Sequence, residues 1–293
     1  MTTPRVALLG LGIMGGGMAR RLLGAGIQRT VFNRNPARAE VLVSLGAKVG
    51  KTPREAAANA EVVLCKVADD VSSRAMWLGV DSALASAPQG AIVVDCSTLS
   101  IEWVKEIAEA ANLCRCEFVD APVTGSKGAA AAGELNFIIG GSAAALEKLR
   151  PELVPMSKSI THLGASGSGA FIKLINNFVC GVQVASIAEA LALIEQSGID
   201  RTKALSVLLD GAPGSPIVKL MVSRMTAPDF TPKFMVKLMA KDLSYALKAA
   251  GSRGLTPNTA RAALDVFQRA IDSGHGDQDM SAVVEPLRKA LRS

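Results

Sequence analysis

Three glycines lie between a short apolar run and a helix-like stretch near the start of the chain. They belong to the segment Gly10-Leu11-Gly12-Ile13-Met14-Gly15, which follows the β-like run VALL directly. In this strand–turn–helix context, the spacing G-x-G-x-x-G predicts a tight turn whose backbone approaches a pyrophosphate closely. The helix that follows offers its first N–H groups to the phosphates. The alternative is a glycine-rich turn that binds nothing.

Short apolar runs alternate with helix-like sequence over the first half of the chain. They are Arg5–Leu9, Thr30–Asn33, Val62–Val67, Ala91–Asp95, Glu117–Ala121 and Asn136–Ile139. This alternation predicts an α/β fold, with a Rossmann-type, doubly wound, mostly parallel sheet covered by crossover helices. The stretch Ala129–Ala132 is interpreted as the start of a helix.

After the segment LGASGSG, near residue 164, no run has the pattern of a strand, and helices separated by Gly- and Pro-containing segments follow. One long helix is predicted from about Ala170 to Ser197, and Gly198 takes the glycine position that ends a helix. A chain of 293 residues fits two domains at about 100–200 residues each. We therefore expect a Rossmann domain over residues 1–164 and an all-helical domain over residues 165–293, joined by the long helix.

The end of the second apolar run indicates which nicotinamide cofactor is bound. An NAD-binding unit usually has Asp or Glu there, about 20 residues beyond the glycines, to accept from the ribose 2′-hydroxyl. This chain has Asn33 and Arg34, with Arg38 one helical turn further on. A guanidinium binds a 2′-phosphate that a carboxylate would repel, so NADPH is predicted in preference to NADH. The alternative is that Asn35-Pro36 only starts a helix and the arginines are solvated.

The segment DAPVTGSKG, residues 120–128, follows the fifth apolar run. Ligands of open parallel sheets lie beyond the carboxyl ends of the strands. Thr124, Gly125 and Ser126 offer two hydroxyls and several backbone N–H groups in a small turn, which suits a carboxylate. The spacing alone does not separate this interpretation from a turn held by local hydrogen bonds.

The apolar segment GAFIKLINNFVCG, residues 169–181, is interrupted by Lys173, Asn176 and Asn177. An unpaired buried charge costs roughly several kcal/mol, so the lysine needs a partner or a role. Lys173 and Asn177 share one helix face at i and i+4. Desolvation lowers a lysine pKa toward working pH, which suits a general acid that protonates a carbonyl oxygen during hydride transfer. The alternative is a salt bridge or a capped polar pocket.

The composition excludes several other functions. The net charge of +6 is spread along the chain and only one Tyr and two Trp are present, which argues against a nucleic-acid partner. Five cysteines without C-x-x-C spacing indicate a reduced, cytoplasmic protein. His162 and His275 are the only histidines, so no metal site is expected. The apolar residues 178–194 include Gln183, Ser186 and Glu189, which predicts a buried helix of a soluble protein rather than a membrane span.

Four segments in order resemble the β-hydroxyacid dehydrogenase family. They are GLGIMGGGMARRL (10–22), DAPVTGSKGAAAAGEL (120–135), GASGSGAFIKLINN (164–177) and KDLSYAL (241–247). The resemblance implies that Lys173 is the catalytic acid and base and that Asn177 assists it. The substrate-binding residues it implies are Thr124, Gly125, Ser126, Asn176, Phe234 and Asp242. The cofactor-binding residues it implies are Gly10, Leu11, Gly12, Ile13, Met14, Gly15, Asn33, Arg34, Val67, Ala68, Thr98 and Lys241.

Two departures from the family pattern lie in the substrate loop, where Thr124 stands for the usual serine and Ser126 for the usual second glycine. The resulting form GSK and the segment GDQDMSAVVE (276–285) near the C-terminus resemble the glyoxylate/succinic semialdehyde reductase branch. Together with Asn33 and Arg34, this resemblance implies NADPH-dependent reduction of small aldehyde acids, and the family resemblance implies a homodimer or homotetramer. The alternatives are a 3-hydroxyisobutyrate dehydrogenase, a tartronate semialdehyde reductase, an imine reductase-like relative and a non-catalytic binding module. Lys173 argues against the last two.

Overall fold

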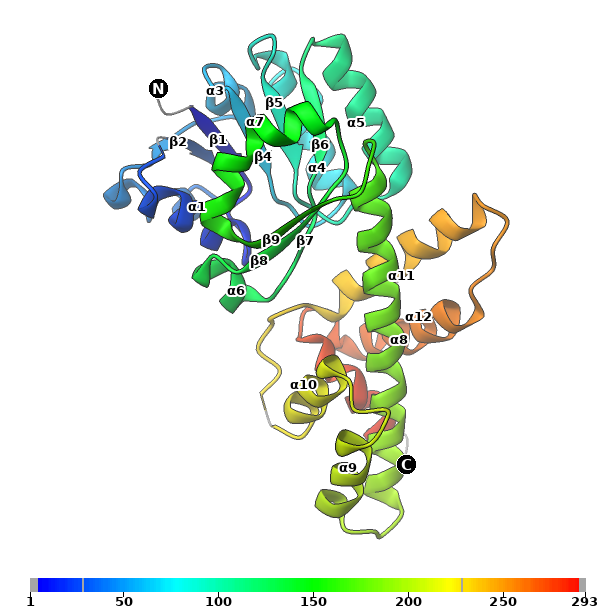
Figure 1. Cartoon of the computed structure of the whole chain (residues 1–293). Helices are drawn as coiled ribbons and strands as arrows, with labels where there is room; N and C mark the ends of the chain where they lie inside the picture. Colours follow the sequence, from blue (N-terminus) through cyan, green and yellow to red (C-terminus); the bar gives the residue numbers. More distant parts are fainter. Residues whose placement is uncertain (1–4, 28, 228, 290–293) are drawn as a thin grey trace. The chain divides into compact units, whose positions relative to one another are not determined.

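The computed structural model describes residues 5–27, 29–227 and 229–289 (Figure 1). Contacts divide the chain into two compact units, residues 1–173 and 174–293. The first unit contains two β-sheets with their helices, and the second is built from helices. The boundary predicted at residue 164 stays a prediction.

The larger sheet of the first unit has six parallel strands in the order β3-β2-β1-β4-β5-β6. The strands are β1 (Val6–Leu9), β2 (Arg29–Phe32), β3 (Lys48–Val49), β4 (Val62–Cys65), β5 (Ile92–Asp95) and β6 (Glu117–Asp120). Every residue of β1, β4 and β5 is buried, as expected for central parallel strands covered on both faces. Strands β2 and β3 are added on one side of β1, and strands β4, β5 and β6 are added on its other side. This arrangement confirms the predicted doubly wound Rossmann sheet.

The sequence prediction differs from the structure at the edge of this sheet. The run Asn136–Ile139 forms β8 (Leu135–Ile139), but β8 lies in a second sheet, between β7 (Val123–Thr124) and β9 (Ser157–His162). The sixth parallel strand is instead β3, whose two residues are both exposed. Neither β3 nor the mostly exposed β9 carries the apolar run by which a buried strand is recognised.

Seven helices accompany these sheets in the described part of the first unit. They are α1 (Gly15–Gly24), α2 (Ala37–Glu40), α3 (Pro53–Ala57), α4 (Asp70–Trp77), α5 (Ile101–Leu113), α6 (Lys127–Ala132) and α7 (Ala143–Leu153), with 3₁₀ turns η1 (Val43–Leu45), η2 (Ala83–Ala85) and η3 (Val154–Met156). Ala129–Ala132 thus ends α6 and does not start it, because the helix begins at Lys127. Helices α1 and α6 pack closely, since a Cβ on Gly17 would lie 3.1 Å from the Cβ of Ala130.

Helix α8 (Ser168–Gln196) begins in the first unit and continues through the second. The other helices of the second unit are α9 (Arg201–Asp210), α10 (Pro216–Met225), α11 (Val236–Gly251), α12 (Asn258–Ala270), the π turn η4 (Ile271–His275), the 3₁₀ turn η5 (Met280–Val284) and α13 (Glu285–Lys289). The hydrophobic core of the second unit includes four fully buried side chains, Leu191, Met221, Leu243 and Phe267. Over residues 174–227 and 229–289 no strand forms, which confirms the predicted all-helical part.

Helix α8 is also the one helix in the described ranges that is long and apolar enough to cross a membrane. Length and composition alone are weak support for a span, because the core helix of a soluble protein meets the same criteria. The buried Lys173 and Asn177 lie on this helix, and a membrane-spanning helix would have to keep such groups away from lipid.

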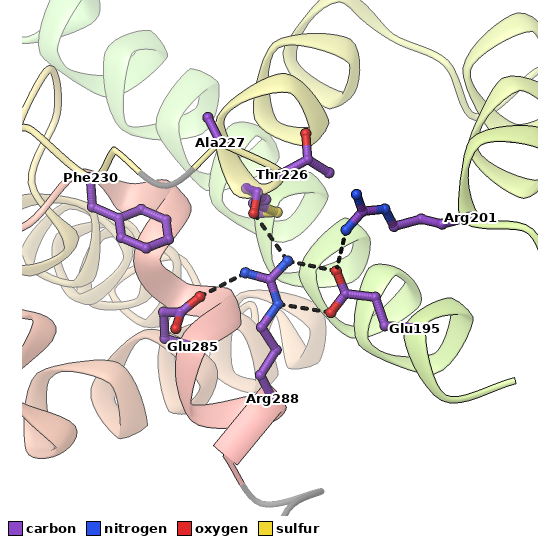
Figure 2. A pocket seen from close by; sticks show the side chains of 8 residues that line it. Glu195, Arg201, Thr226, Ala227, Phe230, Glu285 and Arg288 are labelled. Atoms are coloured by element: carbon purple, nitrogen blue, oxygen red, sulfur yellow. Dashed lines mark hydrogen bonds and ion pairs between the residues drawn. The ribbon is translucent and has the colours of Figure 1, made fainter. Parts of the chain in front are cut away.

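Within the second unit, Arg288 lies beside a hollow of about 580 Å³ (Figure 2). Its guanidinium donates to the carboxylate of Glu195 at 2.8 and 2.6 Å, to Glu285 at 2.7 Å and to the carbonyl of Met225 at 3.1 Å. Arg201 adds an ion pair to Glu195 at 3.5 Å. The two arginines and two glutamates neutralise one another, so the network fastens α13 to α8 and α10.

We expect Arg288→Ala to lower the free energy of unfolding by about 2 kcal/mol, because Glu195 and the Met225 carbonyl lose a charged donor. The hydrogen bond from Arg288 lowers the pKa of the Glu195 carboxyl. The stabilisation that this hydrogen bond gives is therefore fully present above the ordinary glutamate pKa of about 4.3 and is lost as the pH falls through the lowered pKa of Glu195.

Urea unfolding at neutral pH measures the loss of stability in Arg288→Ala, and urea unfolding at acidic pH measures how much of that loss depends on the charge of Glu195. The control is Arg150→Ala, whose pair with Glu147 is exposed, and an equal loss in both variants would contradict the prediction.

Candidate functional site

The structure gives different reasons for the three glycines of the loop at residues 10–15. Gly10 has a φ of +90°, and a Cβ there would clash with the carbonyl of Lys66. A Cβ on Gly15 would clash with the carbonyl of Gly10. A Cβ on Gly12 would meet only the Arg38 guanidinium, at 3.8 Å. The packing of the chain therefore requires the first and third glycines, whereas the second leaves the open approach that a pyrophosphate needs.

Asn33 connects the glycine loop to the end of β2. Its Oδ1 accepts from the Leu11 N–H at 2.8 Å and its Nδ2 donates to the Asn35 carbonyl at 2.9 Å. Arg34 and Arg38 are both exposed beside this junction. The junction therefore presents two guanidinium groups, while the side-chain oxygen of Asn33 is occupied by the loop itself.

A buried carboxylate that sequence reasoning missed organises the ends of β4 and β5. Asp95 accepts from Ser73 Oγ and Trp77 Nε1, both at 2.7 Å, and from the Ser97 N–H at 2.8 Å. Ser97 Oγ in turn accepts from the Val67 N–H at 2.9 Å. Asp95 therefore fixes the two loops that contain Val67, Ala68 and Thr98. Its position at the end of the otherwise apolar run IVVD is the one sequence signal that could have drawn attention to it.

The thiols next to Asp95 belong to the core. Burial is the main cause that raises the pKa of Cys65 well above its ordinary value and that of Cys96 to about 12. Lys66, between the two loops, donates to the Cys96 carbonyl at 2.8 Å. Protonated thiols at these positions act as small hydrophobic side chains.

The loop predicted to hold a carboxylate lies between β7 and α6. Thr124 Oγ1 accepts a long hydrogen bond of 3.4 Å from Asn136 Nδ2. Gly125 has a φ of +127° and is packed against Ala129 and Leu135. Ser126 occupies the N-cap position of α6, yet its side chain makes no capping hydrogen bond, and it is exposed. One hydroxyl of the loop is used locally and the other is exposed, so the binding of a carboxylate by this turn stays a prediction.

Lys173 and Asn177 are buried on α8, with exposed fractions of 8% and 5%. They are four residues apart on one uninterrupted helix, which places them on the same face. Asn176 Nδ2 donates to Asn177 Oδ1 at 2.9 Å, and Asn177 Nδ2 donates to Asp242 Oδ2 at 2.5 Å. Asn177 is thereby held with one orientation of its amide.

Asp242 on α11 is only 1% exposed. Its Oδ1 forms an ion pair of 2.8 Å with Lys241, whose ammonium also lies 4.7 Å from the centre of the Tyr245 ring. Since Oδ2 accepts from Asn177, both carboxylate oxygens have partners within the second unit. Asp242 orients Asn177 and Lys241 by these contacts.

Phe234, predicted to line the substrate pocket, is held by a second carboxylate that sequence reasoning missed. Asp279 Oδ2 accepts from the N–H groups of Lys233 and Phe234 at 3.0 and 3.1 Å, and Arg224 lies 3.5 Å from the same carboxylate. The Met280 N–H donates to the Phe234 carbonyl at 2.7 Å. The segment GDQDMSAVVE therefore fixes the backbone that precedes α11.

The two histidines have local partners. His162 Nε2 lies 2.8 Å from the Gly141 carbonyl, and His275 Nδ1 lies 2.8 Å from Gln278 Oε1. Among the residues that the structure describes, no three His, Cys, Asp or Glu side chains form a group able to hold a metal ion.

Two family models together match most of the chain. Residues 5–164 match the NAD binding domain of 6-phosphogluconate dehydrogenase. Residues 167–287 match a domain described as NAD-binding of NADP-dependent 3-hydroxyisobutyrate dehydrogenase.

Several whole proteins are similar over nearly the full length. Glyoxylate/succinic semialdehyde reductase 2 of Arabidopsis thaliana is 34% identical over 98% of this chain and 80% of its own. The 3-hydroxyisobutyrate dehydrogenase of Pseudomonas aeruginosa is 34% identical over 97% of this chain and 98% of its own. A solved structure of Mycobacterium tuberculosis 3-hydroxyisobutyrate dehydrogenase with L-serine has a TM-score of 0.86 and 33% identity, and covers 98% of this chain and 100% of that one.

Proposed function

The chain belongs to the β-hydroxyacid dehydrogenase family, and from this we propose that it is an NADPH-dependent reductase of small aldehyde acids of the glyoxylate or succinic semialdehyde type. It is an NAD(P)-dependent oxidoreductase of the hydroxyacid dehydrogenase class, like the relatives it matches. The observation that carries the proposed reaction is the buried Lys173, which shares a helix face with the fixed amide of Asn177.

Lys173 is the proposed general acid. Its ammonium donates a proton to the carbonyl oxygen of the aldehyde as the carbonyl carbon is reduced, and the neutral amine then regains a proton from solvent. In the reverse direction the amine accepts the hydroxyl proton. NADPH supplies the hydride when it is bound. Asn177, which Asp242 orients, holds the ammonium or the substrate oxygen by hydrogen bonding.

The carboxylate end of the substrate is assigned to Thr124, Gly125 and Ser126. The exposed hydroxyl of Ser126 and the left-handed backbone at Gly125 support this assignment. Asn176 and Phe234 are assigned to the walls of the substrate pocket, because Asn176 adjoins Asn177 and Asp279 holds the backbone of Phe234.

The cofactor assignment follows from the loop and junction at residues 10–15 and 33–38. The open side of Gly12 fits a pyrophosphate, and Val67, Ala68, Thr98 and Lys241 are the other proposed cofactor contacts. The exposed Arg34 and the absence of an acidic side chain at Asn33 support a 2′-phosphate, and so NADPH over NADH.

The test is the initial rate of NADPH and NADH oxidation with glyoxylate, succinic semialdehyde and tartronate semialdehyde, with a cyclic imine as control. We expect turnover with NADPH on at least one of the acids, slower turnover with NADH, and none with the imine. A protein that binds NADPH but reduces none of the acids would overturn the proposal.

A second candidate is 3-hydroxyisobutyrate dehydrogenase. It is favoured by the family model of residues 167–287 and by relatives of that name at the same level of identity. The same assay run in the oxidative direction, with 3-hydroxyisobutyrate and either NAD or NADP, distinguishes it from the first candidate. A higher kcat/KM for 3-hydroxyisobutyrate than for any aldehyde acid would favour the second candidate.

The homodimer or homotetramer is proposed from the family resemblance, and the cytoplasmic location from the five cysteines without C-x-x-C spacing. Light scattering on the purified protein measures the first, and fractionation of the source cells measures the second.

A further inference from the structure

Asp120 connects parts of the first unit that are far apart in sequence. It is the last residue of β6 and stands directly before the loop assigned to the substrate carboxylate. Its backbone N–H donates to the Gly140 carbonyl at 2.9 Å, and the Gly140 N–H donates back at 2.8 Å, which joins the two sheets. The side chain of Asp120 is 1% exposed and points to neither solvent nor an arginine or lysine partner among the described contacts.

The carboxylate of Asp120 accepts its hydrogen bonds from the start of α8. Oδ1 accepts from the Gly167 N–H at 2.6 Å and Oδ2 accepts from the Ala170 N–H at 2.7 Å, with Ser166 Oγ at 3.4 Å. The first N–H groups of a helix lack partners within the helix and favour an anion. Ala170 is three residues before Lys173, so the carboxylate binds one helical turn away from the proposed general acid.

Two glycines allow this approach. A Cβ on Gly140 would lie 2.5 Å from Asp120 Oδ1, and a Cβ on Gly169 would lie 2.9 Å from Oδ2 and would clash with the Ile138 carbonyl. The backbone at the start of α8 and the backbone that follows β8 therefore both lie directly against the Asp120 carboxylate, with no side chain between them. Burial raises the pKa of Asp120 to about 6, and the N–H and O–H donors around it act in the opposite direction.

We propose that Asp120 is a positioning residue, which holds the first turn of α8 in one register with the substrate loop and thereby sets where Lys173 stands relative to the bound acid. This inference rests on the proposed function of Lys173 and of the loop. Asp120 touches neither substrate nor cofactor in this scheme; it acts through the helix.

The variant to test is Asp120→Asn, whose amide accepts from only one of the two N–H groups and opposes the other with its own NH₂. We expect kcat to fall about 10- to 100-fold, as when catalytic groups are displaced by about 1 Å. The KM for NADPH is expected to change by less than about twofold, because the glycine loop is untouched. The matched control is Glu152→Gln, which neutralises another buried carboxylate of the first unit, in α7. All rates are measured well below the unfolding temperature of each variant.

A second readout does not depend on turnover. The pH dependence of acetylation of Lys173 and the hydrogen exchange of residues 166–173 should both change in Asp120→Asn and not in Glu152→Gln. An unchanged kcat, or an unchanged labelling profile of Lys173, would overturn the positioning role. If the unmodified protein reduces no aldehyde acid, the proposed function fails, and the labelling result alone decides whether Asp120 positions Lys173.

Discussion

Lys173→Ala is expected to lower kcat about 10²- to 10⁴-fold, the usual range for loss of a general acid. The fold should persist, because the substitution leaves alanine, the best helix former, in the uninterrupted helix α8. NADPH binding, measured by fluorescence, should change little. Small primary amines added to the assay should restore part of the rate, since they supply the missing proton donor.

The matched control is Lys158→Ala, which removes an exposed lysine of the first unit. Its kcat should equal that of the unmodified protein. If Lys173→Ala keeps more than about a tenth of the rate, proton transfer by this residue is contradicted, because even the weakest general acids contribute more. Failure of amine rescue in a folded, NADPH-binding variant would instead indicate that the ammonium positions the substrate.

Arg34→Ala is expected to lower kcat/KM for NADPH about 10- to 100-fold, the equivalent of one charge-assisted hydrogen bond to a phosphate. The value for NADH should stay within about twofold, because NADH has no 2′-phosphate. Initial rates with both cofactors on the best aldehyde acid measure the ratio.

Arg38→Ala is the informative comparison, because its guanidinium lies close to the open side of Gly12. If Arg38 contacts the pyrophosphate, its loss lowers kcat/KM for NADPH and NADH alike. Equal losses with both cofactors in Arg34→Ala would contradict its assignment to the 2′-phosphate. Asn33→Asp is less useful, since the amide of Asn33 also holds Leu11 and Asn35.

Features that depend on neighbours in sequence were predictable. The buried strands β1, β4 and β5 are continuous apolar runs, and the glycine loop lies between a strand and a helix as its spacing requires. The long helix was predicted over residues 170–197 and spans 168–196, because its apolar run and the following glycine mark both ends. Strands β3, β7 and β9 were missed, since two of them have only two residues and the third is largely exposed.

Features that depend on distant residues were not predictable. Asp95, Asp120 and Asp279 read in sequence as ordinary acidic residues near strand or helix ends, yet each is buried and collects several donors. The pair of Arg288 and Glu195 joins residues 93 positions apart. No periodicity or motif announces such contacts, because they form only when separate elements pack together.

The sequence by itself determined the central strands β1, β4 and β5, the glycine loop between a strand and a helix, and the shared face of Lys173 and Asn177, because each is set within a few residues by backbone geometry and side-chain spacing. Only the tertiary structure decided that Asn136–Ile139 joins a second sheet, that Asp242 fixes Asn177, and that Asp120 holds the start of α8. These arrangements form because buried polar groups must have hydrogen-bond partners once distant segments pack together. The partners lie far apart in the chain, so no short sequence pattern identifies them.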